Sequence, residues 1–295
     1  MGCRFFWGLC FCFLDGYLVD IDLGFKVVDE VKCSICQGQM AHVFSAILLG
    51  KYNADYMVCQ SCGYLKVHEP YWLSEAYSSA IADADTGLVA RNVLIGEKLS
   101  SLLFWGMAER GRGRYLDSAG GYGMLTRLMR DYGFDFYWSD KYCKNFLARG
   151  FEYEAGAGGC LAVTAMEVLE HVTDPVGHVE ETLRYANADT LIFSTELYDG
   201  APPNPDEWWY YSLPTGQHIG FFQHRTLQAL ADKLSLNFYS ANGIHIFTRR
   251  NLRVKWLRVV TSSYFSKATA PLLRCFMKSK TMDDHRKILN LVSKL

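Results

Sequence analysis

The stretch of residues 115–123 constrains the fold more than any other part of this sequence. A short apolar run ends at Asp117, and a turn rich in glycine then opens an amphipathic segment. About one helix length later, a second apolar run over residues 134–139 ends at Asp140. In an open α/β sheet, ligands bind where parallel strands end. The layout therefore predicts a nucleoside-binding crevice between these two strand ends.

Glycine lets the backbone turn sharply and approach a ligand closely, because it has no Cβ atom. Asp140 follows the second predicted strand, where a carboxylate can accept hydrogen bonds from both ribose hydroxyl groups. A dinucleotide site also fits this outline, but the spacing G-x-G-x-x-G counted from Gly121 meets Thr126 instead of a third glycine. The phosphate-loop pattern G-x-x-x-x-G-K-[ST] is absent too.

Three motifs in this order resemble class I S-adenosylmethionine (SAM)-dependent methyltransferases. Residues 117–123 resemble the family's first motif, with Ala119 where glycine is usual, and Asp140 matches its ribose-binding acid. Residues 165–172, Ala-Met-Glu-Val-Leu-Glu-His-Val, are similar to the family's fourth-strand segment, which borders the adenine. The resemblance covers roughly residues 90–250. It implies an α/β, Rossmann-like sheet of seven strands and a SAM site formed by Asp117, Ala119, Gly121, Gly123, Asp140 and Met166.

Strand-like and helix-like segments alternate along this region, which predicts a parallel sheet. Strands are expected at residues 115–116, 134–139, 151–154, 161–166, 190–195, 236–240 and 244–248. Helices are expected at residues 92–110, 124–131, 141–149, 174–188 and 226–234. The pair Asp174-Pro175 is typical of a helix start, with an acid at the N-cap and proline at the first position.

Ten cysteines are present, and four of them form two Cys-x-x-Cys pairs, Cys33 with Cys36 and Cys59 with Cys62. Each pair can hold a metal from one tight turn, and four thiolates suit tetrahedral Zn²⁺. The pattern favours a zinc-ribbon-like site in a reducing compartment over a disulfide framework. Four thiolates close the coordination sphere, so this zinc is expected to stabilise the fold and not to activate water.

Four regions are expected along the chain: an N-terminal extension at 1–24, a zinc-binding module at 25–70, a methyltransferase domain at 90–250 and a basic C-terminal helical segment at 251–295. The apolar run at residues 5–14 is shorter than the roughly 20 residues that span a bilayer. A non-structural extension is the favoured interpretation of 1–24, and a signal peptide is the alternative. No membrane span is expected, and the predicted location is cytoplasmic.

A base is needed if the methyl acceptor is a hydroxyl group or an acidic carbon, and histidine is the usual base near neutral pH. His218 is the candidate, because it follows an aromatic loop on the carboxyl side of the predicted sheet. Its segment is similar to the Glu-His-Leu-x-Tyr-Phe-Ser element of zinc-containing sugar C-methyltransferases, in which the Glu-His pair serves proton transfer. Gln217 stands at the position of the acid, which leaves His218 alone. A hydrogen-bonded loop histidine without catalytic duty is the alternative.

Two further groups of residues have more than one interpretation. Glu167, Glu170 and His171 form a tempting acid–base cluster, but structural or cofactor-side roles are favoured for them. The Trp-Trp-Tyr-Tyr run at 208–211 fits either a pocket lining or the core. The basic tail fits a solvated helical face, with a binding surface for an anionic partner as the sharper alternative.

The sequence thus predicts a SAM-dependent methyltransferase that acts on a small molecule, with a nucleotide-linked or glycan sugar as the favoured acceptor. The formal net charge of −1 argues against nucleic-acid affinity for the whole chain. Two alternatives stay open. One is an RNA or protein methyltransferase that uses the zinc module as a reader, and the other is a non-catalytic module that binds the cofactor.

Overall fold

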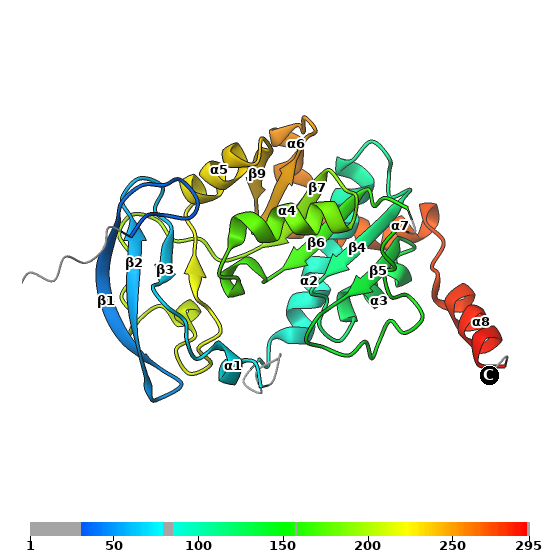
Figure 1. Cartoon of the computed structure of the whole chain (residues 1–295). Helices are drawn as coiled ribbons and strands as arrows, with labels where there is room; N and C mark the ends of the chain where they lie inside the picture. The colour runs from blue at the N-terminus through cyan, green and yellow to red at the C-terminus, as the bar shows by residue number, and fades with distance from the viewer. Residues whose placement is uncertain (1–30, 79–84, 157, 294–295) are drawn as a thin grey trace, which may run out of the picture. The chain divides into compact units, whose positions relative to one another are not determined.

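The computed structural model describes residues 31–78, 85–156 and 158–293, apart from the side chains of Arg274 and Leu291. The predicted extension at 1–24 and the first residues of the predicted zinc module lie outside the described residues. The compact unit Lys32–Leu295 contains two separate β-sheets (Figure 1).

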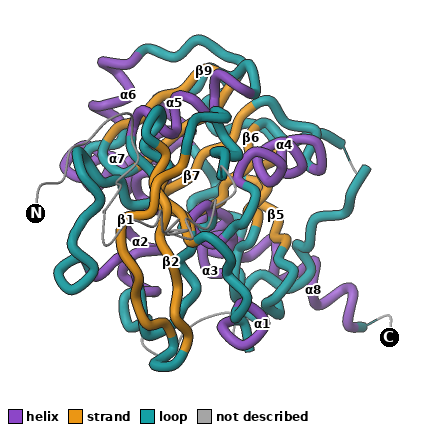
Figure 2. Tube along the Cα trace, turned by 60° about the vertical axis from the view of Figure 1, so that its left-hand side comes forward, coloured by secondary structure: helices purple, strands orange, loops and turns teal. Residues whose placement is uncertain are grey.

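The first sheet is antiparallel and carries the four paired cysteines at one end. Its order is β1-β2-β3-β8, formed by β1 (Met40–Leu48), β2 (Tyr52–Cys59), β3 (Leu65–Val67) and β8 (Gly220–Phe221). Figures 1 and 2 both show β1 and β2 side by side. The short strand β8 comes from the predicted methyltransferase region, so the chain returns to the first sheet after about 150 residues.

The second sheet has six strands in the order β5-β4-β6-β7-β10-β9. They are β4 (Arg114–Ser118), β5 (Asp135–Ser139), β6 (Ala162–Met166), β7 (Thr190–Ser194), β9 (Asn237–Ala241) and β10 (Ile244–Thr248). The first four are parallel, and β10 runs antiparallel to both of its neighbours. This is the Rossmann-like arrangement that was predicted, but the sheet is mixed and has six strands instead of seven.

The missing strand is the one predicted at residues 151–154. Only Glu152 pairs with the sheet there, in an isolated parallel bridge to Trp138 of β5. The Trp138 amide donates to the Phe151 carbonyl (2.8 Å), and the Tyr153 amide donates to the Trp138 carbonyl (2.7 Å). The edge strand is therefore reduced to a single bridge.

The helix predicted at residues 141–149 is also absent, because side chains there bind the local backbone. Asp140 accepts hydrogen bonds from the amides of Tyr142 and Cys143, both at 2.7 Å. The Asn145 side chain binds both the amide and the carbonyl group of Ala148. Such bonds offer the backbone an alternative to helical pairing.

Of the remaining helices, those predicted at 124–131, 174–188 and 226–234 are present, the first with the predicted ends and the other two with shifted ends. The described helices are α1 (Leu73–Ala76), α2 (Leu88–Ser101), α3 (Met124–Asp131), α4 (Pro175–Tyr185), α5 (His224–Lys233), α6 (Val254–Val260), α7 (Ser263–Phe276) and α8 (Thr281–Val292). The predicted helix at 92–110 is α2 followed by a π-helical turn, Leu102–Gly106. Asp174 caps α4 as predicted, since its carboxylate accepts from the Gly177 amide.

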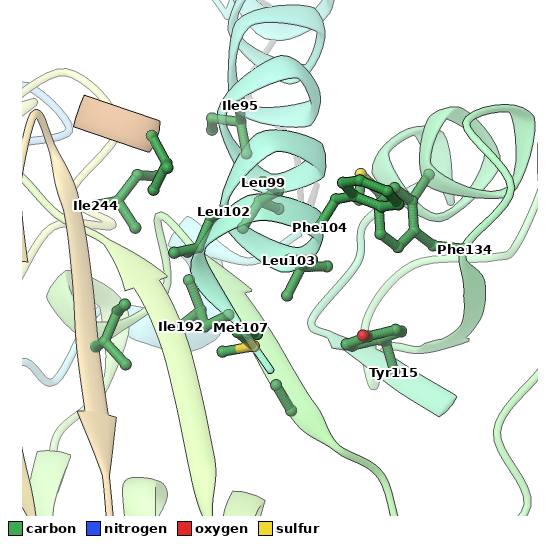
Figure 3. Close-up of a cluster of buried hydrophobic side chains, with 14 of the residues drawn as sticks. Ile95, Leu99, Leu102, Leu103, Phe104, Met107, Tyr115, Phe134, Ile192 and Ile244 are labelled. Carbon is green, nitrogen blue, oxygen red and sulfur yellow. The ribbon is translucent and has the colours of Figure 1, made fainter. Parts of the chain in front are cut away.

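The main core lies on one face of the second sheet. Leu99 of α2, Met129 of α3 and Leu273 of α7 are fully buried there against strand residues such as Tyr115 and Ile192. Figure 3 shows the side chains of α2 and the π-helical turn directed at these strands. In Figure 1, α4 crosses in front of the sheet. Helices thus cover the sheet while the carboxyl ends of β4 to β7 stay at one edge.

Candidate active site and metal centre

The four cysteines of the two Cys-x-x-Cys pairs come together at the end of the first sheet. Their sulfur atoms all lie within 4.8 Å of one another. The Sγ atoms of Cys33 and Cys62 are 3.7 Å apart, and those of Cys36 and Cys59 are 3.4 Å apart. Tetrahedral Zn²⁺ with bonds of about 2.3 Å requires sulfur atoms about 3.8 Å apart. The donor set and its spacing therefore fit a four-cysteine zinc site, with modest adjustment.

The glycine turn lies between β4 and α3. Ala119 adopts a φ of 53°, in the left-handed region that favours glycine, which agrees with glycine being usual at this position in the family it resembles. Gly123 has a φ of 86° and precedes α3, and a Cβ atom there would lie 2.7 Å from Asn145 Oδ1. The turn thus depends on left-handed backbone conformations, and the segment that follows β5 packs closely against Gly123.

Asp140 lies beside this turn, as the sequence predicted. Its carboxylate accepts from the Gly121 amide at 2.9 Å, in addition to the two amides that follow it in the chain. A carboxylate has about four acceptor positions, so these three bonds leave capacity for a ribose hydroxyl group. Asp140 is half-buried, and the geometry therefore fits a nucleoside cofactor.

Asp117 lies in a different environment. Its side chain is only 2% exposed and accepts from the hydroxyl groups of Thr126 and Thr164, at 3.0 and 2.9 Å. Burial raises the pKa of Asp117 to about 6. These contacts tie β4 to α3 and β6, and they also explain Gly120, where a Cβ atom would lie 2.7 Å from the Asp117 carboxylate. Its predicted contact with the cofactor stays a prediction.

The end of β6 supplies Met166 and then Glu167, which has a φ of 54°. Met166 packs against the main core, at the edge where the adenine was predicted. The Glu167 amide donates to the Ser194 carbonyl at the end of β7, and the Ser194 hydroxyl donates to the Glu167 carboxylate. The ends of β6 and β7 are thereby joined.

Two histidines from distant parts of the chain meet next to these strand ends. The rings of His171 and His218 are 4.7 Å apart, nearly perpendicular. His171 Nδ1 lies 3.1 Å from the Gln217 carbonyl, and His218 Nδ1 lies 2.6 Å from the Tyr210 carbonyl. A carbonyl only accepts, so each Nδ1 carries the hydrogen and each neutral ring keeps its lone pair on Nε2.

Burial keeps both rings neutral near pH 7. It lowers the pKa of His171 to about 3, aided by the neighbouring His218, and the pKa of His218 to about 4. A neutral imidazole with a free Nε2 lone pair can accept a proton. His218 is therefore neutral near pH 7 with the hydrogen on Nδ1, and its low pKa makes it a weaker base than an exposed histidine.

Glu170 is the third member of this group. A carboxylate oxygen of Glu170 and one ring nitrogen of each histidine all lie within 4.8 Å of one another. Its side chain is 0% exposed, and neither of its oxygens has a hydrogen-bond partner in the described part of the chain. Burial, with the charge of Glu167, raises its pKa to about 8, and the nearby hydroxyl groups of Tyr210 and Thr195 oppose this rise.

Some residues of the aromatic loop lie in the core, others lie near the candidate site, and Gln217 has a structural contact. Tyr211 is buried in the core of the first sheet, Trp209 is exposed, and the Tyr210 hydroxyl group lies 3.1 Å from the Thr195 hydroxyl group. The Gln217 side-chain amide donates to the Ala76 carbonyl at 2.7 Å and so anchors the end of α1. This position therefore performs a structural role where the resembling enzymes have an acid.

The sequence analysis named His218 as a candidate base and Glu170 and His171 as part of a separate cluster, but it did not predict that the three lie together. The Glu170-His171 pair was visible at a predicted strand end, yet only the fold brings it next to a residue 47 positions later. The signal available in the sequence was the Glu-His pair itself, at the edge where parallel strands deliver catalytic groups.

Comparison with known proteins agrees with this geometry. A family model described as a methyltransferase domain matches residues 90–241, just over half of the chain. The chain therefore belongs to this family of methyltransferase domains. Residues 90–241 therefore form a domain of the SAM-dependent methyltransferase class, and the four-cysteine cluster lies on a separate antiparallel sheet. No curated protein sequence matches it.

Several solved methyltransferase structures are similar to it. CalO1, a methyltransferase in calicheamicin biosynthesis in its SAH-bound form, is 11% identical with a TM-score of 0.39, over 59% of each chain. Magnesium protoporphyrin IX methyltransferase (ChlM) from Synechocystis PCC 6803 with bound SAM is 16% identical with a TM-score of 0.36, over 61% of this chain and 94% of that one. The plantazolicin methyltransferase BpumL with SAH is 10% identical with a TM-score of 0.41, over 61% and 95%.

The chain spans about three fifths of the length of CalO1. Similarity at this level does not identify the methyl acceptor. Within the described residues, no helix combines the length and the apolar character that crossing a bilayer requires.

The buried Glu170 generates a prediction about stability and pH. Its pKa of about 8 lies above the ordinary value of 4.5, so the folded state keeps a proton that the unfolded state loses above pH 4.5. The protein therefore loses stability as the pH rises from about 4.5 to 8, by up to about 1.4 kcal/mol per pH unit. Glu170→Gln removes this titration. We expect its free energy of unfolding to exceed the wild-type value by more at pH 8 than at pH 5, measured by urea unfolding.

The matched control is Glu154→Gln, because Glu154 is exposed. It should follow the wild-type curve at both pH values. An equal offset for Glu170→Gln at pH 5 and pH 8 would show that Glu170 is ionised throughout.

Proposed function

We propose that this methyltransferase transfers the methyl group of SAM to a weakly acidic group of a small molecule, with His218 as the general base. The observation that carries the proposal is the meeting of His218, His171 and Glu170 at the edge of the sheet that also bears the glycine turn. A base beside a cofactor site is the arrangement that methyl transfer to a hydroxyl group or an acidic carbon needs.

SAM supplies an already activated methyl group, so the protein's task is to hold the reactants and to remove a proton. We propose that Ala119, Gly121 and Gly123 contact the cofactor through their backbone. Asp140 accepts from the ribose, and Met166 borders the adenine. Asp117 contributes by holding the turn in place through Thr126 and Thr164.

His218 takes the proton of the acceptor on Nε2, while its Nδ1 keeps its hydrogen and donates it to the Tyr210 carbonyl. This hydrogen bond fixes the ring and stabilises the positive charge that develops on it. Glu170 adds a carboxyl group close to the ring from another element. We propose that Glu170 thereby replaces the acid of the Glu-His pair, whose position in the sequence is taken by Gln217.

A sugar, free or linked to a nucleotide, is the acceptor that we propose. Support comes from the combination of a four-cysteine cluster with the Gln217-His218 element, which resembles zinc-containing sugar C-methyltransferases. Aromatic side chains also gather near the site: Tyr77 stacks on Tyr142 at 5.3 Å and lies 6.3 Å from the His171 ring. Aromatic rings offer apolar faces against which a sugar can pack. Labelled methyl transfer to a panel of nucleotide sugars, with RNA and protein as controls, tests the acceptor class.

We propose that the four-cysteine cluster holds structural zinc. The Cys62 amide points to the Cys59 sulfur at 3.5 Å, as in a turn that presents thiolates to a metal. Four sulfur ligands leave no open position, so the metal supports the first sheet and takes no part in the transfer.

His218→Ala should lower kcat by about 10²- to 10⁴-fold, because the proton acceptor is lost. The affinity for S-adenosylhomocysteine, measured by calorimetry, should stay within about twofold of the wild-type value, since the ring does not form the proposed cofactor site. His224→Ala is the control, because that ring is exposed and packs on Phe238. Undiminished turnover in the His218 variant would exclude it as the base.

Asp140→Ala should weaken binding of S-adenosylhomocysteine by about 1–3 kcal/mol, through the loss of charged hydrogen bonds to the ribose. Calorimetry measures the change, and the melting temperature separates it from general unfolding. Asp199→Ala, an exposed acid on another loop, should bind as the wild type does. If Asp140→Ala and Asp199→Ala bind S-adenosylhomocysteine with equal affinity, Asp140 does not bind the ribose.

Cys59→Ser should lose the bound zinc, because a structural site needs all four thiolates. Mass spectrometry of the purified protein should find about one zinc per wild-type chain and much less in the variant, with a lower melting temperature. Cys275→Ser is the control, since this cysteine is exposed and lies outside the cluster. Full metal content in the Cys59 variant contradicts the four-ligand site.

A further inference from the structure

The segment after β10 has an unusual charge distribution. Residues 249–282 contain nine basic side chains and no Asp or Glu, although the whole chain has a net charge of −1. Arg250 is bound to Glu109 and Asp189. Within the described residues, no ion pair involves Arg253, Lys255, Arg258 or Lys267. The positive charge of these four side chains therefore faces solvent without an internal counter-ion, whereas Lys278 and Lys280 pair with Asp283 and Asp135.

Helix α6 combines this charge with exposed apolar groups. Leu257 and Val260 are buried and anchor the helix to the main core. Basic and apolar side chains are paired along its exposed side, where each of three basic residues is followed by an apolar residue. These pairs are Arg253-Val254, Lys255-Trp256 and Arg258-Val259, and all six residues are exposed, with Trp256 at 41%.

Helix α7 is oriented with much of its apolar surface outward. Its inner side buries Ser266, Ala270 and Leu273. The outer positions follow helical spacing, at residues 264, 267, 268, 271, 272, 275 and 276, and only Lys267 among them is charged. Tyr264 is 92% exposed and Phe276 is 65% exposed. A helix normally turns its apolar side to the core, so this outer stripe is available for a partner.

Aromatic contacts connect the two helices, and we call their outward residues together the basic–apolar face. Trp256 donates its indole hydrogen to the Trp105 carbonyl at 2.7 Å, and the Trp105 ring lies 6.1 Å from the Phe276 ring. Trp256 also contacts Phe265 of α7, with ring centroids 5.9 Å apart. A shallow hollow lined by Val254, Trp256 and Val259 lies between basic side chains of α6.

We propose that the basic–apolar face docks the protein on the surface of an anionic lipid membrane. Anionic headgroups attract the unpaired basic side chains, and the region below them accepts Trp256, Tyr264, Leu272 and Phe276. Tryptophan and tyrosine favour the boundary between headgroups and acyl chains. The attachment is peripheral, with α6 and α7 lying along the membrane plane.

Two other occupants fit the face less well. A nucleic acid neutralises the basic side chains but offers no apolar layer for the aliphatic and phenyl groups of α7. A second copy of the chain in a symmetric dimer brings the same patch, and so the same positive charge, against itself. Residues 249–282 contain no Asp or Glu, and α7 turns an apolar stripe outward. Together these two features favour a lipid membrane over a nucleic acid and over a second copy of the chain.

The test is co-sedimentation of the full chain with vesicles. We expect binding to vesicles of phosphatidylcholine with about 30% phosphatidylglycerol, weaker binding as NaCl increases, and little binding to pure phosphatidylcholine. Lys255→Glu/Arg258→Glu should weaken partitioning by at least about thirtyfold. Tyr264→Ser/Leu272→Ser should weaken it by about tenfold or more without changing the charge. Both variants should keep the wild-type melting temperature and methyl transfer.

Lys144→Glu/Arg184→Glu is the control, with the same change in net charge at exposed positions outside the face. It should bind vesicles as the wild type does. Equal binding by all variants, or equal binding to neutral and anionic vesicles, would overturn the proposal. RNA retention or dimerisation that the face variants abolish, without any vesicle binding, would also overturn it in favour of those partners.

Discussion

Two hydrogen bonds between the turn after β6 and the segment before β8 hold the candidate active site together. The Ile219 amide donates to the Glu170 carbonyl at 2.8 Å, and the His171 ring donates to the Gln217 carbonyl. They fix a loop from late in the chain against the end of a central strand. His218 lies between these two contacts, so its place beside His171 and Glu170 follows from them. Every functional argument about the base depends on this pairing.

Local signals in the sequence were sufficient for most of the second sheet. The apolar run before Asp117, the glycine turn and the Asp174-Pro175 start each act over a few residues, and each appears where predicted. The predicted strand at 151–154 and helix at 141–149 are missing because local hydrogen bonds from side chains to the backbone compete with regular secondary structure there. Asp140 and Asn145 bind the backbone around them, and the chain reaches the sheet edge for only one residue.

The rest of the site depends on contacts that no local pattern encodes. The sequence grouped Glu170 with its neighbours Glu167 and His171, but its contact with His218 and its burial near Tyr210 and Thr195 arise only in the folded chain. Gln217 likewise finds its partner, the Ala76 carbonyl, 141 positions earlier. Charge patterning indicated a basic tail, but the outward apolar stripe of α7 became visible only once its inner side was known.

The short strand β8 has a consequence for how the protein is made. It completes the cysteine-bearing sheet by pairing Leu65 with Phe221, and Thr226 adds a bond to the Cys62 carbonyl. These pairings close loops of roughly 150 residues or more, and contacts of such high sequence separation form slowly. During synthesis the cysteine turns leave the ribosome long before their last strand does. The first sheet therefore stays incomplete, with β3 as an unpaired edge, until the segment that carries both His218 and β8 has been synthesised.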